Sequence, residues 1–267
     1  MSKIVLVTGA SSGLGQAIAE RLAAQGHTVF GTTRLPRGDV GKVRMIALDV
    51  TDDFSVTRAI NEVIAAAGRI DVLINNAGVG ICGAVEDTGL DEVRRQMETN
   101  FFGSVRTIHA VIPHMRAQGA GRIINVSSLA GLVSLPFQAY YSASKFALEA
   151  LNEALRMELS GTGIDSTNIN PGDFRTGFTA ARVFTRQALS GRNATQLTTT
   201  VGMYERDENK GADPALVATL AARLVVQRRV SVRYSVGRFD QRLMVLVKRA
   251  IPAWVFERMM RAVYAIE

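Results

Sequence analysis

The chain has 267 residues, of which 47% are hydrophobic and 21% charged, a balance typical of globular proteins. A chain of this size buries enough surface to fold without a disulfide or a structural metal. Its one cysteine, Cys82, has no partner for an internal disulfide. The sequence shows neither a signal peptide nor a run of 18 apolar residues, so we expect a cytoplasmic protein without a membrane span.

The formal net charge of +7 is concentrated at one end of the chain. Residues 223–267 hold ten Arg or Lys against three Asp or Glu and so carry all of it. A basic tail can bind nucleic acid or anionic lipid, but a solvated helical face is the commoner explanation and the one we favour. Aromatic residues are not interleaved with the basic ones and no nucleic-acid motif is recognisable, so we expect no nucleic-acid partner.

Strands and helices alternate through the first two thirds of the chain. Apolar runs predict strands at 4–8, 28–32, 44–47, 72–75, 121–127 and 163–170. Helical patterns lie between them at 13–25, 53–67, 90–118 and 139–159. Continuously apolar strands alternating with helices predict one α/β domain over 1–267, a doubly wound parallel sheet of the Rossmann type. Its ligand should lie at the carboxyl ends of the strands, where the strand order reverses.

The C-terminal third follows another pattern. Residues 176–212 are polar, rich in threonine and without a long clear period, so we interpret them as a loop that forms a lid over the substrate. Pro214 opens a short helix at 215–227, and a variable appendage at 241–267 is amphipathic and split by Pro252. The appendage could close over substrate, pack on a partner subunit or rest on an anionic membrane, although two short halves argue against a strong anchor.

A glycine-rich turn follows the first predicted strand and leads into a helix. Its glycines allow a diphosphate to approach backbone N–H groups at the positive end of the helix. Placed between a strand and a helix, the pattern predicts a dinucleotide site. The residues expected to hold the diphosphate are Gly9, Ser11, Ser12, Gly13, Leu14 and Gly15.

The end of the second strand indicates which dinucleotide binds. A carboxylate there would accept the ribose 2′-hydroxyl of NAD. This chain has Thr32, Thr33 and Arg34 instead, and Arg34 can make a bidentate contact with a 2′-phosphate. We therefore predict NADP(H), with an exposed surface arginine as the alternative.

Two further segments fit the adenosine. Asp49, followed by Val50, ends the third strand, where a carboxylate can accept a hydrogen bond from the adenine amino group. The fourth strand ends in Asn76, Ala77 and Gly78, small residues beside which the adenosine can pass.

A tyrosine and a lysine form the candidate acid–base pair. Tyr141 and Lys145 are four residues apart, which places both on one helical face. A free tyrosine has a pKa near 10, and a neighbouring ammonium together with a positive nicotinamide should lower it. Tyr141 could then exchange a proton with a carbonyl or alcohol. Tyr140 competes, but the residue four positions after it is Ser144, not a cation.

Ser128 follows the strand at 121–127, where a hydroxyl can polarise a substrate carbonyl, and Ser127 meets the same description. With these residues in place the chain resembles the short-chain dehydrogenases/reductases over residues 3–176. The motifs that carry the resemblance, in family order, are TGASSGLG at 8–15, NNAG at 75–78, NFFG at 100–103, Ser128, YSASK at 141–145 and NPG at 170–172. Within the family, Arg34 just after the usual acid position makes the chain similar to the NADP-preferring subgroup. The chain is less closely similar to 17β-hydroxysteroid and retinol dehydrogenase-like members.

The resemblance implies roles for individual residues. Ser128 (rather than Ser127), Tyr141 and Lys145 take the places of the family's catalytic triad, and Asn100 that of an asparagine that interrupts a long helix and holds a water. Lys145 would also hold the nicotinamide ribose. Segments covering the nicotinamide are matched by Pro171, Gly172 and Thr176. The family also implies hydride transfer between NADP(H) and a carbonyl or alcohol carbon, in a homodimer or homotetramer formed through 90–118 and 139–159.

The residues near the nicotinamide are mostly apolar and predict a pocket for a lipophilic ketone or aldehyde, with core packing as the alternative. They are Val79, Ile81, Cys82, Leu132, Val133, Leu135, Phe137, Phe174, Phe178 and Phe184. The competing function is an NADP(H)-sensing regulatory or scaffold protein on the same fold. Such a protein could dispense with Tyr141 and Lys145, and both are present.

Overall fold

Seven parallel strands form the centre of the computed structural model, which describes residues 2–35, 38–178 and 180–266. The strands are β1 (Ile4–Val7), β2 (Thr28–Thr33), β3 (Val43–Ala47), β4 (Val72–Asn75), β6 (Gly121–Val126), β7 (Ile164–Pro171) and β9 (Arg233–Val236). Their order is β3-β2-β1-β4-β6-β7-β9, with every neighbouring pair parallel. The order reverses between β1 and β4, which confirms the predicted doubly wound α/β sheet.

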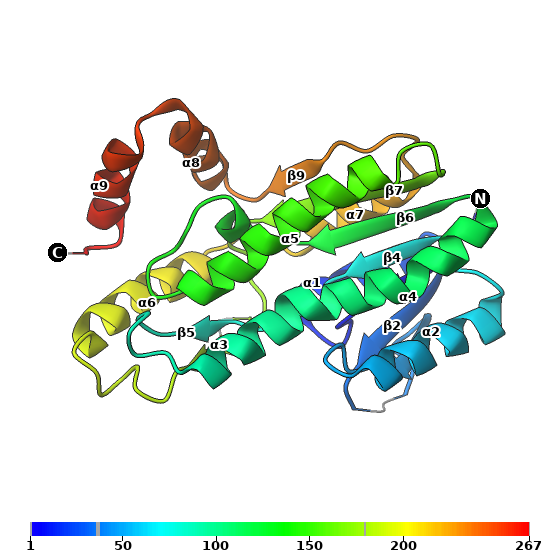
Figure 1. The fold of residues 1–267 in the computed structure, drawn as a ribbon, viewed down its shortest axis with the longest axis horizontal. Helices are drawn as coiled ribbons and strands as arrows, with labels where there is room; N and C mark the ends of the chain where they lie inside the picture. Colours follow the sequence, from blue (N-terminus) through cyan, green and yellow to red (C-terminus); the bar gives the residue numbers. More distant parts are fainter. Residues whose placement is uncertain (1, 36–37, 179, 267) are drawn as a thin grey trace.

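Helices cover both faces of this sheet (Figure 1). They are α1 (Gly13–Ala24) and α7 (Ala215–Val226) on one face, and α2 (Asp53–Ala67), α4 (Gly103–Gln118) and α5 (Ala139–Glu158) on the other. Alternation along each strand builds a separate core on each side. In β1, Val5 and Val7 pack towards α1 and α7, whereas Leu6 packs towards α2, α4 and α5. Both sides of the strands are therefore apolar, as expected for a buried parallel sheet.

The long helix expected at 90–118 is divided into three pieces. It runs as α3 (Leu90–Met97), then a π-helical turn η1 (Glu98–Phe102), then α4. A π-helical turn inserts extra backbone into a helix and frequently marks a functional site. Here the turn carries Asn100, so the structure shows the helix interruption that the family resemblance implied.

The expectation of a loop at 176–212 is wrong. The segment contains β8 (Val183–Phe184), which pairs with β5 (Ile81–Cys82), and α6 (Ala194–Asn209). Leu197, Val201 and Tyr204 of α6 are buried at helical spacing. Threonines, which are weak helix formers, surround these three residues and obscured the period. Position 179 of this segment, and Met1 and Glu267 at the ends of the predicted domain, lie outside the described residues.

The C-terminal helices lie beyond the carboxyl ends of the strands (Figure 1). They are α8 (Phe239–Ala250) and α9 (Ala253–Val263), divided near Pro252 as the sequence predicts, although α8 begins two residues before 241. Among the helices that the structure describes, none has the length and hydropathy needed to cross a membrane.

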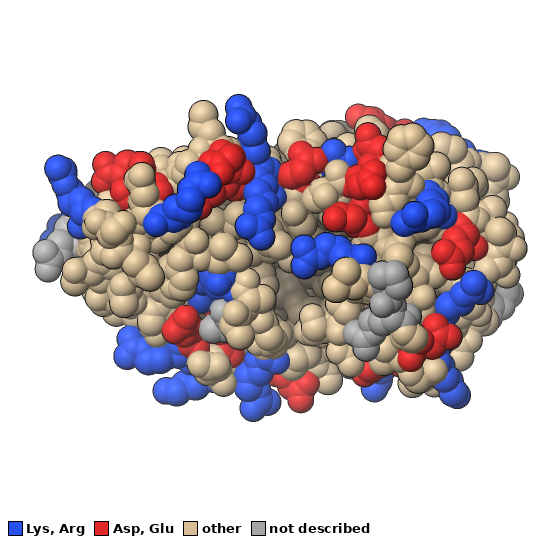
Figure 2. Space-filling view, turned by 90° about the horizontal axis from the view of Figure 1, so that it is seen from below, with Lys and Arg blue, Asp and Glu red and all other residues tan. Residues whose placement is uncertain are grey.

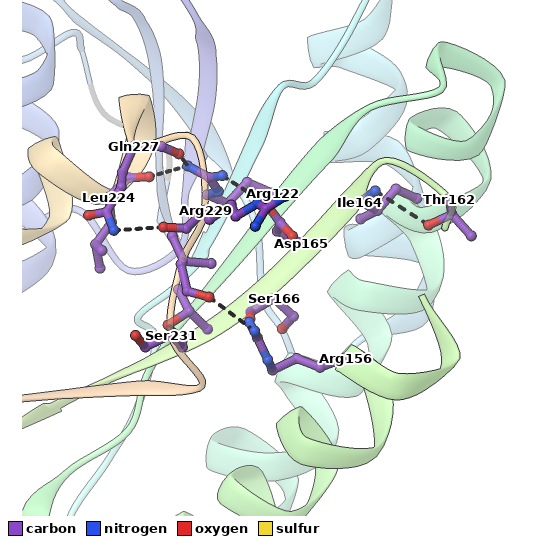
Figure 3. A network of polar contacts seen from close by, with 12 residues as sticks. Arg122, Arg156, Thr162, Ile164, Asp165, Ser166, Leu224, Gln227, Arg229 and Ser231 are labelled. Carbon is purple, nitrogen blue, oxygen red and sulfur yellow. Dashed lines mark hydrogen bonds and ion pairs between the residues drawn. The ribbon is translucent and has the colours of Figure 1, made fainter. Parts of the chain in front are cut away.

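Two arginines attach the segment before β9 to the sheet (Figure 3). The guanidinium of Arg122 donates to the carbonyls of Leu224 and Gln227 and pairs with Asp165. Arg156 donates to the carbonyl of Ser166 and to that of Val230. The strand β9, which the sequence analysis missed, is thus positioned by side chains far away in the sequence.

Candidate active site

A cavity of about 790 Å³ lies at the carboxyl ends of the strands. Loops after β1, β2, β3, β4, β6 and β7 line it, together with Tyr204 and Glu208 of α6. A hollow bordered by Lys and Arg side chains is visible near the centre of the face in Figure 2. The cavity spans the point where the strand order reverses, the location predicted for the ligand.

The turn after β1 takes a conformation that only glycine adopts readily. Gly9 has φ of +63° and Gly13 φ of +57°, both in the left-handed region. A Cβ atom at Gly15 would overlap the Asn76 amide and the Gly9 carbonyl. The Asn76 amide donates to the carbonyls of Thr8 and Gly9 at 3.0 Å each. These contacts hold the start of α1 against the end of β4 and leave a backbone-lined cradle at the helix N-terminus, which fits a diphosphate.

Nearly all predicted cofactor residues line this one cavity. They are Gly9, Ser11, Ser12, Gly13, Leu14, Arg34, Asp49, Val50, Asn76, Ala77, Gly78, Tyr141, Lys145, Pro171, Gly172 and Thr176. Gly15 is not part of the lining, because it packs behind the turn against Asn76. Arg34 is exposed at the cavity edge next to Leu35, where a ribose phosphate could reach it.

Ser128, Tyr141 and Lys145 come together in the lining of this cavity. The Nζ atom of Lys145 lies 5.8 Å from the centre of the Tyr141 ring and donates to the Val126 carbonyl at 2.9 Å. Tyr141 also packs against the ring of Phe178, with 5.8 Å between centroids. The strand end at β6 and the first turns of α5 therefore place a hydroxyl, a phenol and an ammonium in one small region.

The phenol is not acidic in the protein itself, contrary to our expectation. Burial raises the pKa of Tyr141 to about 12, and the neighbouring Ser128 hydroxyl opposes this rise. Burial also lowers the pKa of Lys145 to about 8, against the attraction of Glu149. Burial is the main cause; Glu208 and Asp173 also raise the pKa of Tyr141, whereas Arg182 lowers it. At neutral pH Tyr141 is protonated and suited to donate a proton.

Asn100 does not line the cavity but acts on a segment that does. Its Oδ1 accepts from the Val79 N–H at 2.8 Å, and its Nδ2 donates to the Val79 carbonyl at 3.0 Å. Gln96, one helical turn earlier, holds the Ile81 N–H at 2.8 Å and the Val79 carbonyl at 2.8 Å. The sequence analysis missed Gln96, although its spacing of four residues from Asn100 could have indicated the shared face.

Several charged residues that the sequence analysis missed gather near Tyr141 in the same cavity. Asp173 and Glu208 line it, and Arg182, whose side chain is 1% exposed, pairs with Glu208. Burial raises the pKa of Asp173 to about 6, and the nearby Glu208 adds to the rise, while the Gln241 amide hydrogen bond opposes it. Arg182, Glu208 and Gln241 lie beyond the motifs, so nothing local in the sequence marked them as neighbours of Asp173.

Comparison with known proteins identifies the group to which this site belongs. The profile of the short chain dehydrogenases matches residues 3–187. The chain belongs to the short-chain dehydrogenase family. A 3-ketodihydrosphingosine reductase of Bacteroides thetaiotaomicron is 42% identical over 99% of this chain and 98% of its own length. The family resemblance found in the motifs is therefore confirmed.

Solved structures of other short-chain dehydrogenases share the architecture. One from Streptomyces avermitilis is 34% identical and superposes with a TM-score of 0.81 over 93% of this chain and 92% of its own. Another, from Burkholderia phymatum and in complex with NAD, is 24% identical with a TM-score of 0.80 over 93% of each chain. The second likeness bears on the fold alone.

The apolar residues predicted for the dehydrogenase's substrate pocket fall into two groups. Those that line the cavity are Val79, Leu135, Phe174 and Phe178. Those that pack elsewhere or face solvent are Ile81, Cys82, Leu132, Val133, Phe137 and Phe184. Burial raises the pKa of Cys82 to about 12, which leaves it an inert core thiol. In the described part of the chain no group of His, Cys, Asp or Glu could hold a metal ion.

Proposed function

We propose that this dehydrogenase reduces an apolar ketone or aldehyde to an alcohol with NADPH. One observation carries the proposal: Tyr141, protonated at neutral pH, lines the same cavity as the glycine turn after β1, with Ser128 beside it. A binding protein that only sensed the coenzyme would have no need of this arrangement.

The residues divide the proton chemistry between them. The reduced coenzyme, when bound, supplies the hydride that forms the new C–H bond. The hydroxyls of Ser128 and Tyr141 donate hydrogen bonds to the carbonyl oxygen and stabilise its developing negative charge. Tyr141 then gives its proton to that oxygen, so the C=O double bond becomes a C–O single bond with one new O–H bond. Lys145 faces the phenolate with a positive charge until a proton returns, and Asn100 keeps the Val79 segment in place.

Arg34 supports NADP(H) as the coenzyme. It lies at the cavity edge directly after β2, with Thr32 and Thr33 before it and no acidic residue at this strand end. A guanidinium there can pair with a 2′-phosphate, whereas the NAD pattern requires an acceptor for a 2′-hydroxyl. Asp49 and Val50 at the end of β3 complete the proposed adenosine site.

The substrate proposal draws on the lining and on a relative. Val79, Leu135, Phe174 and Phe178 give the lining an apolar part. The Bacteroides relative is named for the reduction of 3-ketodihydrosphingosine, a ketone with a long alkyl chain. We therefore include long-chain ketones of this kind in the proposed substrate class. We also propose that residues 176–212 act as a lid over the substrate. The proposed location of the protein is the cytoplasm.

A homodimer or homotetramer is the proposed assembly. On the helices expected to form the interface, Phe102, Phe146 and Met157 are exposed to solvent. Apolar side chains on neighbouring helices can be buried by a second copy of the same surface.

The decisive experiment follows NADPH oxidation by the full chain with a series of ketones and aldehydes of increasing alkyl length, and identifies the alcohol product by mass. Turnover with NADPH that rises with chain length supports the proposal. Tight NADPH binding without reduction of any carbonyl compound would favour the sensing or scaffold function instead.

A further inference from the structure

The helices α8 and α9 pack on the rest of the chain through one side only. Val245 of α8 and Phe256 and Met260 of α9 are buried in one cluster with Val133. Lys248 donates to the Leu132 carbonyl at 2.6 Å. Contacts within this chain therefore cover the inward side of α8 and α9. The two helices project at one end of the molecule (Figure 1).

The outward side of the pair carries large apolar residues in solvent. Phe239 is 75% exposed, and Leu243 and Leu246 are exposed with it. Their spacing of four and then three residues puts them on one stripe of α8. In the first turn of α9, Trp254 is 69% exposed. Four large apolar side chains on these two helices are thus exposed to water. Their apolar surface would be buried if another molecule bound there.

Unpaired arginines share these outward faces. Arg242 and Arg249 flank Leu246 on α8, while Arg258 and Arg261 follow Trp254 at positions four and seven residues later on α9. All four arginines are exposed, and none forms an ion pair within the described part of the chain. Apolar side chains alternating with cations are typical of helices that lie at a lipid interface.

We propose that the outward side of α8 and α9 rests on an anionic lipid surface. Phe239, Leu243 and Leu246 enter the boundary between headgroups and acyl chains, and the arginines pair with lipid phosphates. Trp254, apolar with one N–H donor, suits the same depth. A second copy of this face is a poor partner, because it would bring two sets of unpaired arginines together.

The two helices associate with the surface without crossing the bilayer. They have 12 and 11 residues, well short of the roughly 20 that a span requires. Pro252 lies at the start of α9 and lets the pair bend. Association with the lipid surface is compatible with two helices that are too short to form a strong membrane anchor.

The lipid-facing helices also touch the wall of the cavity. Gln241 of α8 donates to the Asp173 carboxylate and accepts from the Asp173 N–H at 3.1 Å. The ring of Tyr264, just after α9, lies 5.0 Å from that of Tyr204. Asp173 and Tyr204 both line the cavity. A lipid substrate could then enter the cavity directly from the bilayer. This consequence rests on the proposed function, whereas the binding of α8 and α9 to lipid does not.

Vesicle binding by the full chain, without coenzyme or substrate, tests the proposal. Trp254 is the only tryptophan, so intrinsic fluorescence reports directly on α9. We expect the chain to sediment with vesicles of phosphatidylcholine and phosphatidylglycerol but not with phosphatidylcholine alone. Its emission should shift to the blue on binding, and high salt should reverse both effects. Absence of binding to the anionic vesicles overturns the proposal.

Variants distinguish binding through this face from nonspecific adsorption of the protein to vesicles. Each of Arg242→Gln and Arg249→Gln should lower vesicle partitioning about fivefold, the equivalent of about 1 kcal/mol per basic residue. The double variant L243S/L246S should lower it further. The matched control is Phe54→Ser, because Phe54 is 89% exposed on α2, away from the pair, and should change nothing.

Two outcomes would contradict this assignment. Equal binding by the α8 variants and by Phe54→Ser would show that another surface holds the lipid. A blue shift of Trp254 that tracks protein concentration without lipid, together with dimer formation in light scattering, would assign the face to a second copy. Because these measurements involve no turnover, they remain decisive even if the proposed reaction is not found.

Discussion

Two parts of the cavity are held together by different kinds of contact. One is the glycine turn after β1, where we propose that the coenzyme binds (the coenzyme end), and the other lies at Asp173 and Glu208, where we propose that the substrate binds (the substrate end). At the coenzyme end, short loops directly after strands meet through backbone groups. The Thr8 hydroxyl accepts from the N–H groups of Asn76 and Ala77 at 2.9 and 3.0 Å. At the substrate end, a buried ion pair joins Arg182 to Glu208, and Gln241 reaches Asp173 across 68 residues of sequence.

The difference shows where single side chains matter most. Backbone contacts at the coenzyme end depend on turn geometry that glycine and small residues preserve. Charged contacts at the substrate end lie away from water, where an unmatched charge costs far more than at the surface. We therefore expect substitutions at the two ends to fail in different ways: loss of coenzyme affinity at one, and loss of stability or altered pH response at the other.

The largest effect is expected at Tyr141, the proposed proton donor. Tyr141→Phe removes the proton donor and keeps the ring that packs on Phe178, so kcat should fall by about 10² to 10⁴. NADPH affinity, measured by fluorescence titration, should change little. A phenylalanine variant with near-normal kcat would remove Tyr141 from the mechanism.

The buried ion pair should dominate the stability of the substrate end. Arg182→Met removes the cation of a buried ion pair, which typically costs about 3–5 kcal/mol of unfolding free energy. Urea unfolding followed by circular dichroism measures this. Arg186→Met, which breaks the exposed pair with Asp91, is the control and should cost under about 1 kcal/mol. Equal losses in the two variants would show that burial of the Arg182 pair has no energetic role.

Asp173 should give this end its pH response. Its pKa rises from 3.8 to about 6 on folding, so ionising it destabilises the folded chain as pH rises through that interval. Asp173→Asn removes the penalty and should raise the unfolding free energy by up to about 3 kcal/mol at pH 8 and hardly at all below pH 4. Thermal melts at both pH values measure the difference, with exposed Glu257→Gln as control. A pH-independent difference would contradict the prediction.

The smallest effect is expected at the coenzyme end. Arg34→Ala should raise the KM for NADPH by about 10- to 100-fold, the loss of one charge-assisted contact. The KM for NADH should stay unchanged, since that coenzyme lacks the phosphate. Steady-state kinetics with both coenzymes give the ratio. A parallel change for both would show that Arg34 supports the loop rather than the phosphate.

The same division explains what the sequence could and could not predict. The strands of the sheet up to β7 were predicted because each is a short apolar run bounded by turn residues, and the glycine turn because its residues are consecutive. The strand β9 escaped detection because it is only half-buried and is held in place by Arg122 and Arg156 from distant segments. The helix α6 escaped because threonines obscured its buried stripe.

The candidate site divides in a similar way. Tyr141 and Lys145 could be placed together from helical spacing, which is a local rule. The strand end indicated a serine, and the family resemblance chose Ser128 over Ser127. The pKa of Tyr141 could not be predicted, because it depends on burial, a property of the assembled fold. Asp173 and Glu208 meet only after β7 and α6 are packed, and no spacing rule joins residues 35 positions apart.

The π-helical turn at Glu98–Phe102 restricts how this chain can tolerate deletions. The turn already takes up one residue more than a regular helix holds, so removing a residue here would let α3 and α4 continue as one regular helix. Asn100 would then lose the position from which it holds the N–H and the carbonyl of Val79. A one-residue shortening, which most surface loops absorb without harm, would here release a segment that lines the cavity.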